Sequence, residues 1–218
     1  ILGVGGFGCV AMGRFRGTLV AVKAPRPNVQ RNTWKMVASL CNELRLLRRI
    51  RHTHIVAFHG AAIDPGSGEL AMIYEFAGGV VMDEFLNEVH QRQEGRELAV
   101  LKVLVDVASA LCHLHGASPP IVHGDIKTAN IKVSLLEGGA PFAKLLDFGL
   151  SRLNTGSARP LGGTRPWMAP ELFRGPGANA CANTQPAPSS DTYSFGILIH
   201  CAATCLHPRS SFDKANMR

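Results

Sequence analysis

The sequence contains little that would mark a membrane, secreted or metal-binding protein. No apolar run approaches the roughly 18–20 residues that span a bilayer, so no membrane segment is expected in this chain. The start Ile1-Leu2-Gly3 has neither the basic residues nor the apolar block of a secretory signal. The six cysteines form no C-x-x-C pair, which argues against a zinc site or a disulfide framework and favours reduced thiols and a cytoplasmic location. With 18% charged and 46% hydrophobic residues, the composition predicts a packed core.

The formal net charge of +7 raises the question of nucleic-acid binding. The arginines concentrate in one helical stretch, R-L-L-R-R-I-R-H at 45–52, without interleaved aromatic residues. A solvated helix face, or a surface for acidic ligands, explains this pattern about as well as a nucleic-acid surface does. We therefore expect no nucleic-acid partner, and salt-dependent binding to nucleic acid would show the opposite.

Hydrophobic periodicity divides the chain into a strand-rich first third and a largely helical remainder. Strand-like segments are expected at 13–23, with a glycine-centred turn, and at 55–63, 70–76, 131–134 and 144–146. Helical periods are expected at 33–50, 98–114 and 194–206. Gly78-Gly79 separates the two parts. This order predicts an α+β fold with a small β-rich lobe, a glycine hinge and a helical lobe.

A glycine-rich segment, G-V-G-G-F-G-C-V, occupies positions 3–10. Glycines at this spacing let backbone N–H groups approach phosphates closely. Dinucleotide-binding folds use the same spacing, but they need a helix next, and here a strand ending in V-A-V-K (20–23) follows. A glycine-rich hairpin followed by a strand lysine is the arrangement of a protein kinase. A glycine-rich turn with a chance lysine remains open at this point.

Further motifs follow in a fixed order. They are C-N-E-L-R-L-L (41–47), V-H-G-D-I-K-T-A-N (122–130), D-F-G (147–149), A-P-E (169–171) and D-T-Y-S-F-G (191–196). The chain with these motifs resembles the eukaryotic-type protein kinases. The stretches G-T-R-P-W-M-A-P-E (163–171) and S-D-T-Y-S-F-G-I-L (190–198) are most similar to the tyrosine-kinase-like group of Ser/Thr kinases. The resemblance implies a two-lobed protein kinase-like fold over 1–218, with an N-lobe at 1–76, a hinge near 75–79 and a partial C-lobe at 77–218.

The resemblance also implies chemical roles. Asp125 would accept or orient the proton of the substrate hydroxyl, and Lys127 would steady the transferring phosphoryl group. Lys23 would bind the α- and β-phosphates, with Glu43 as its ion-pair partner. The expected function is transfer of the ATP γ-phosphoryl group to Ser or Thr of protein substrates.

The expected ligands are ATP and Mg²⁺. The residues implied to hold Mg²⁺ are Asn130 and Asp147. The residues implied to bind the nucleotide are Gly3, Val4, Gly5, Gly6, Gly8, Val10, Ala21, Lys23, Glu75 and Ala77.

The sequence departs from the family pattern at Gly124, where the family has an arginine that binds a phosphorylated activation loop. Without that guanidinium, activity is expected to depend little on phosphorylation of Thr155 or Ser157. Tyr74 would narrow the pocket behind the adenine, and the stem of Lys132 would cover the ring. His123 is expected to pack beneath Phe148.

The chain does not begin with Met and stops soon after the last apolar helix, so we expect a piece of a longer protein whose C-lobe lacks its last helices. Glu171 would then be buried without its arginine partner, and Ile197, Leu198 and Ile199 would be partly exposed. A catalytically weak or inactive kinase-like scaffold that binds nucleotide and partners is the alternative function.

Overall fold

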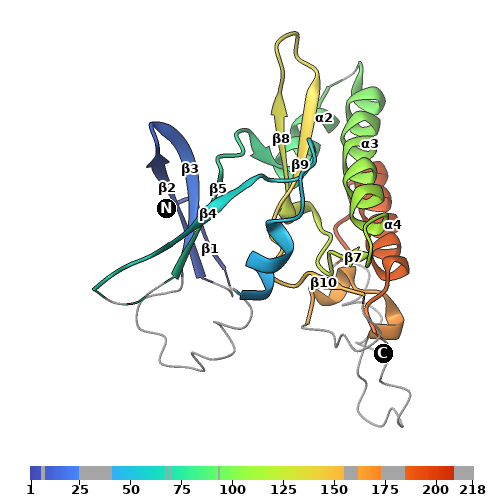
Figure 1. Ribbon diagram of the computed structural model, residues 1–218. Coiled ribbons are helices and arrows are strands. Elements are labelled where there is room, and N and C mark those ends of the chain that lie inside the picture. The colour runs from blue at the N-terminus through green and yellow to red at the C-terminus, as the bar shows by residue number, and fades with distance from the viewer. Residues whose placement is uncertain are drawn as a thin grey trace.

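The molecule has a β-sheet lobe and a helical lobe, with a second, smaller sheet between them (Figure 1). The computed structural model describes residues 1–5, 8–24, 41–66, 68, 70–92, 94–154, 162–172 and 185–208. The predicted residues Gly6, Thr155 and Ser157, and the first part of the predicted helix 33–50, lie outside the described residues. Residues 41–47 are helical, as expected, and lie beside the larger sheet.

The N-lobe is an antiparallel sheet of five strands in the order β1-β2-β3-β5-β4. These strands are β1 (Gly3–Gly5), β2 (Gly8–Phe15), β3 (Thr18–Ala24), β4 (Phe58–Ile63) and β5 (Leu70–Glu75). The β2–β3 hairpin turns through Arg16 and Gly17, both with positive φ (51° and 83°), as a tight two-residue hairpin requires. The predicted hairpin at 13–23 is confirmed.

The C-lobe consists of three described helices and short strands. The helices are α2 (Met82–His90), α3 (Arg96–His115) and α4 (Pro188–Thr204). The strands are β6 (Val80–Val81), β8 (Ile131–Leu135) and β9 (Pro141–Leu145) in one sheet, and β7 (Ile121–Val122) and β10 (Arg152–Leu153) in another. Single 3-10 turns are η1 (Thr128–Asn130), η2 (Arg165–Trp167) and η3 (Pro170–Leu172). The predicted two-lobed fold is confirmed.

The two lobes are joined by backbone hydrogen bonds as well as by the chain that passes from β5 to β6. Ile55 forms a parallel bridge with Leu145 of β9. The Val56 N–H donates to the Leu145 carbonyl at 3.0 Å, and the Leu145 N–H donates to the His54 carbonyl at 2.9 Å. The strand predicted at 55–63 therefore begins only at Phe58, because residues 54–56 pair with the other lobe.

Several sequence expectations about the C-lobe need correction. The last helix begins at Pro188, before the predicted start at 194, because proline fits the first helical turn, where its missing N–H costs nothing. It ends at Thr204, since Cys205 adopts a left-handed conformation (φ 59°). Helix α2 was not predicted at all.

The expected burial of Glu171 is also wrong. Its 3-10 turn, η3, leaves the side chain exposed to solvent, so Glu171 is not a buried unpaired carboxylate. Leu198 is completely buried in the core cluster of the helical lobe, whereas Ile199 is 43% exposed and Ile197 is partly buried. The expectation of partial exposure on α4 thus holds for only two of the three residues.

Helix α3 is long and apolar enough, by length and composition, to cross a membrane, which the search for apolar runs did not predict. This is weak evidence, because a core helix has the same composition. The helix contacts β9, α2 and α4, and Val103, Val107 and Leu114 are fully buried in the core. One face of α3 therefore packs in the core of the helical lobe, whereas Leu98, Leu101 and Val105 on the same helix are exposed.

Candidate active site

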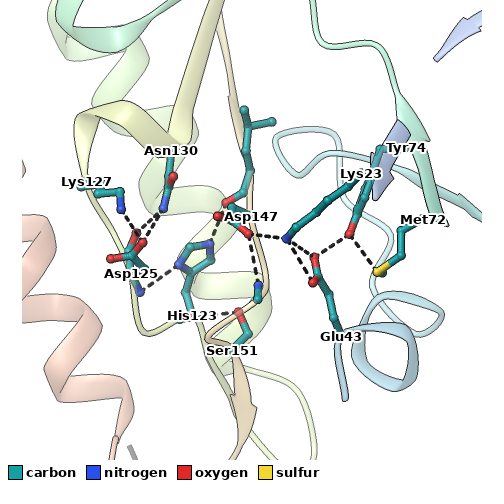
Figure 2. Close-up of polar contacts among 12 residues, drawn as sticks. Lys23, Glu43, Met72, Tyr74, His123, Asp125, Lys127, Asn130, Asp147 and Ser151 are labelled. Carbon is teal, nitrogen blue, oxygen red and sulfur yellow. Dashed lines mark hydrogen bonds and ion pairs between the residues drawn. The ribbon is translucent and has the colours of Figure 1, made fainter. Parts of the chain in front are cut away.

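Three charged side chains from distant parts of the chain meet between the lobes (Figure 2). Lys23 lies on β3, Glu43 on the helical segment 41–47, and Asp147 just after β9. The Lys23 ammonium Nζ lies 3.2 Å from Oε1 and 3.1 Å from Oε2 of Glu43. On its other side Nζ lies 2.8 Å from Oδ1 of Asp147. One buried ammonium therefore binds two carboxylates, of which one lies 20 residues and the other 124 residues further along the chain.

The mutual contacts keep Lys23 and Asp147 charged. Burial alone would lower the pKa of the Lys23 ammonium, but the Glu43 and Asp147 carboxylates raise it above its ordinary value. Burial would likewise raise the pKa of the Asp147 carboxyl, but Lys23 holds it below its ordinary value. Lys23 is only 8% exposed and Glu43 is buried, so this ion pair is shielded from water, whereas the side chain of Asp147 is 34% exposed.

Tyr74, near the end of β5, adds a fourth polar group to this cluster. Its hydroxyl donates to Oε1 of Glu43 at 2.5 Å and lies 3.6 Å from the Met72 sulfur. Burial, followed by the nearby Glu43 carboxylate, raises the pKa of the Tyr74 phenol far above its ordinary value. Its ring packs edge-on against Phe58, with the centroids 5.7 Å apart. The phenol therefore remains protonated and acts as a donor to Glu43.

A second polar group surrounds Asp125, in the loop between β7 and β8. Its Oδ2 accepts hydrogen bonds from Lys127 Nζ at 2.6 Å and from Asn130 Nδ2 at 3.0 Å. Its Oδ1 accepts from the Thr164 hydroxyl at 2.8 Å. Lys127 Nζ also donates to the Thr164 hydroxyl oxygen at 2.8 Å. The contact with Thr164 was not predicted, because nothing in the spacing places residue 164 beside residue 125.

The loop around Asp125 is held in place by Asp191, a buried aspartate in the first turn of α4. Asp191 accepts the backbone N–H groups of His123 at 2.7 Å and Gly124 at 2.9 Å. His115 Nε2 also lies 2.9 Å from Asp191. The His123 ring packs edge-on against Phe148 at 4.9 Å between centroids, which confirms the predicted contact. The loop is thus attached to both the last helix and the D-F-G segment.

Between the lobes lies a cavity of about 290 Å³ that is lined by Lys23, Glu43 and Asp147, and by Asn130 of the second group, but not by Asp125 or Lys127. Its lining includes the predicted nucleotide residues Gly3, Val10, Ala21, Lys23, Glu75 and Ala77. Gly8, at the start of β2, is not among the lining residues, and Val4 and Gly5 belong to β1. The lining also includes apolar residues that the sequence did not single out, namely Leu2, Val56, Phe76, Val81, Ala129 and Leu146.

Tyr74 and Lys132, for which the sequence predicted roles beside the nucleotide, both line the cavity. Tyr74 lines the cavity beside Lys23, on the side of Glu43. Lys132, on β8, also lines it, and its Nζ donates to the Gly79 carbonyl at 3.0 Å.

The cavity wall also presents oxygen atoms that suit a magnesium ion. Asp147 and Asn130 both line it. Asp147 adopts a left-handed backbone conformation with φ 57°, an unusual value that is often found at functional sites. Asn130 directs its amide nitrogen at Asp125, so its amide oxygen would be the ligand atom. Mg²⁺ is usually bound by one or two carboxylates together with substrate phosphates, so this donor set fits the ion.

The metal-ligand set is small. Among the residues that the structure describes, no cluster of three or more His, Cys, Asp or Glu side chains is arranged to hold a metal ion. A cation at Asp147 and Asn130 would therefore take its other ligands from bound phosphate groups and water.

Comparison with known proteins identifies the family. The family model described as "protein kinase domain" matches residues 1–217. Serine/threonine-protein kinase CTR1 of Arabidopsis thaliana is 32% identical over 219 residues and covers 99% of this chain. Mitogen-activated protein kinase kinase kinase 10 of Homo sapiens is 33% identical over 208 residues, or 91% of the chain. Dual specificity protein kinase splA of Dictyostelium discoideum is 31% identical over 231 residues, or 99% of the chain.

The chain spans only 25%, 20% and 9% of the lengths of these three relatives, in the same order. The family match nevertheless extends over nearly the whole chain and includes every motif that places a side chain in the site. The resemblance seen in the sequence is confirmed: the chain belongs to the protein kinase family.

Proposed function

We propose that this protein transfers the γ-phosphoryl group of ATP to serine or threonine side chains of protein substrates. The observation that carries the proposal is the placement of Lys23, between Glu43 and Asp147, on the wall of the same cavity that Asn130 lines. Phosphoryl transfer depends on positioning and on neutralising charge, and this arrangement offers fixed groups for both.

The nucleotide would enter the cavity between the lobes. The apolar wall formed by residues such as Val10, Ala21 and Leu146 suits a flat base. The Lys23 ammonium, fixed by its carboxylate partners, would bind the phosphates. Mg²⁺, which protein kinases generally use, would be held by Asp147 and Asn130 and would neutralise phosphate charge.

The proposed acceptor is an aliphatic hydroxyl, and Thr164 supports this choice. Its hydroxyl donates to Asp125 Oδ1 and accepts from Lys127 Nζ, both at 2.8 Å. Asp125 and Lys127 are therefore spaced to bind one hydroxyl oxygen between them. A substrate serine or threonine that met the same pair would have its proton directed to Asp125 and its oxygen near a cation. The name of one relative, serine/threonine-protein kinase CTR1, supports the same class.

The test is to incubate the purified protein with isotopically labelled ATP, Mg²⁺ and a peptide library containing Ser, Thr and Tyr acceptors. We expect label on Ser and Thr, and none when Lys23 is replaced by Met. Dominant labelling of Tyr would refute the acceptor class. Nucleotide binding without transfer to any acceptor would support the alternative of a non-catalytic scaffold. We also propose that the protein acts in the cytoplasm with its thiols reduced.

A further inference from the structure

Gly124 leaves the catalytic loop without a cation at the position where the family's arginine would bind a loop phosphate. Its backbone has φ 79°, in the left-handed region that favours glycine. A Cβ atom at this position would lie 3.0 Å from the Leu150 carbonyl oxygen. The backbone here is therefore shaped for glycine, and the segment after D-F-G must be held by other means.

Residues 151–154, shortly after Gly149, are held by hydrogen bonds to neighbouring segments. Ser151 is completely buried, and its hydroxyl donates to the His123 carbonyl at 2.9 Å. The next two residues, in β10, pair with β7, and the Asn154 N–H donates to the Pro120 carbonyl at 2.8 Å. The start of the segment is thus attached to the catalytic loop by neutral hydrogen bonds, without a phosphate.

The same short segment is also attached to the helix that carries Glu43. The Asn42 amide Nδ2 donates to the Ser151 carbonyl at 2.9 Å. Asn42 immediately precedes Glu43 in sequence, so this bond restrains the turn of helix that presents Glu43 to Lys23. Ser151 therefore links the catalytic loop, through its hydroxyl, to the helix, through its carbonyl.

We propose that Asn42 and Ser151 form a positioning pair, here called the Asn42–Ser151 clamp, that holds Glu43 against Lys23 without a loop phosphate. Since helix position decides whether Glu43 meets Lys23, the clamp would keep the nucleotide site assembled in the unphosphorylated protein. The proposal rests on the proposed kinase function, of which it describes the regulation.

The test uses Asn42→Asp, which keeps the shape of the side chain but replaces the amide donor with a carboxylate that repels the Ser151 carbonyl. Asn87→Asp, at an exposed position on α2, is the matched control. Each protein is measured with and without phosphatase treatment. The measurements are the dissociation constant of ATP with Mg²⁺ and the turnover of a peptide substrate. A thermal melt shows whether each variant is folded, and Asn42→Ala replaces Asn42→Asp if the latter does not fold.

We expect phosphatase-treated wild type and Asn87→Asp to retain nucleotide affinity and turnover within about twofold of the untreated protein. Asn42→Asp should bind ATP about tenfold more weakly and turn over about tenfold more slowly, with faster hydrogen exchange at residues 151–154. Equal ATP affinity and turnover in the Asn42 variant and Asn87→Asp would overturn the clamp, as would a large loss of wild-type activity on phosphatase treatment.

The nucleotide measurement separates this proposal from the proposed function. If no variant transfers phosphate, the kinase proposal fails. The clamp is then still decided by the ATP dissociation constants and by hydrogen exchange, neither of which needs catalysis.

Discussion

The Tyr74 hydroxyl donates a hydrogen bond to Oε1 of Glu43 at 2.5 Å, on the carboxylate that also binds Lys23. Glu43 is thus held by a phenol from β5 as well as by the ammonium from β3. Because both strands belong to the same sheet, these two contacts bind the helical segment 41–47 to that sheet as a unit.

Removal of that hydroxyl should weaken the site. Tyr74→Phe deletes one oxygen and leaves the ring packed, so the loss is that of a single hydrogen bond to a charged group, about 1.5–3 kcal/mol. We expect kcat/KM for peptide phosphorylation to fall about tenfold, since about 1.4 kcal/mol corresponds to a factor of ten. The other tyrosine of the chain, Tyr193 on α4, is 37% exposed, and Tyr193→Phe is the control. Equal rates for the two variants would contradict the role assigned to the Tyr74 hydroxyl.

Two adjacent glycines between β5 and β6 should differ in how well they tolerate a side chain. At Gly79 the φ angle is 81°, and a Cβ atom would lie 2.0 Å from the Val133 carbonyl oxygen. At Gly78 a Cβ atom would meet nothing within 4 Å. We expect Gly79→Ala to lower the melting temperature by at least about 5 °C, from backbone strain and overpacking of about 2 kcal/mol or more. Gly78→Ala should have a melting temperature close to that of wild type. Similar melting temperatures for the two variants would contradict the close contact between residue 79 and Val133 of β8.

Local sequence signals were sufficient for the elements on which the motifs lie. The β2–β3 hairpin follows from alternating residues around a glycine turn. Helix α3 follows from its apolar period, and its observed bounds agree with the prediction to within two residues. The resemblance then placed Lys23, Glu43 and Asp147 in one site, which spacing alone could not do.

Contacts between distant segments could not be predicted in this way. Asn42 and Ser151 lie 109 positions apart, and Asp125 and Thr164 lie 39 apart. Which donor meets which acceptor depends on how the lobes pack, and no local pattern records it. The predicted burial of Glu171 failed for the same reason, because it transferred a family expectation to a side chain that the local 3-10 turn leaves exposed.

A histidine group at the joint of the lobes should make stability depend on pH. His52 stacks on His113 with the centroids 5.0 Å apart, and His54 lies close by at 5.6 Å. Burial, and then the proximity of His113 and His54, lower the pKa of His52 below its ordinary value. As pH falls below about 6.5, the unfolded chain therefore takes up a proton at this residue before the folded chain does. The folded state should lose stability over this range, down to the lowered folded pKa.

Urea unfolding at pH 7.5 and pH 5.5 checks this expectation. The free energy of unfolding should fall with pH less steeply in His52→Gln than in wild type. The exposed His59, replaced by Gln, is the control and should leave the wild-type slope unchanged. The same slope in all three proteins would mean that His52 is not the group responsible.

The most direct test of the account is the turnover of Asp125→Asn, measured together with its affinity for ATP. An asparagine retains the size of the side chain but cannot accept a proton, while the cavity and Lys23 are unchanged. The account predicts an ATP dissociation constant within about twofold of wild type and a kcat about 10²–10⁴-fold lower, the usual contribution of a general base. A variant that phosphorylates serine and threonine peptides at the wild-type rate would contradict the central claim that Asp125 directs the acceptor hydroxyl in this site.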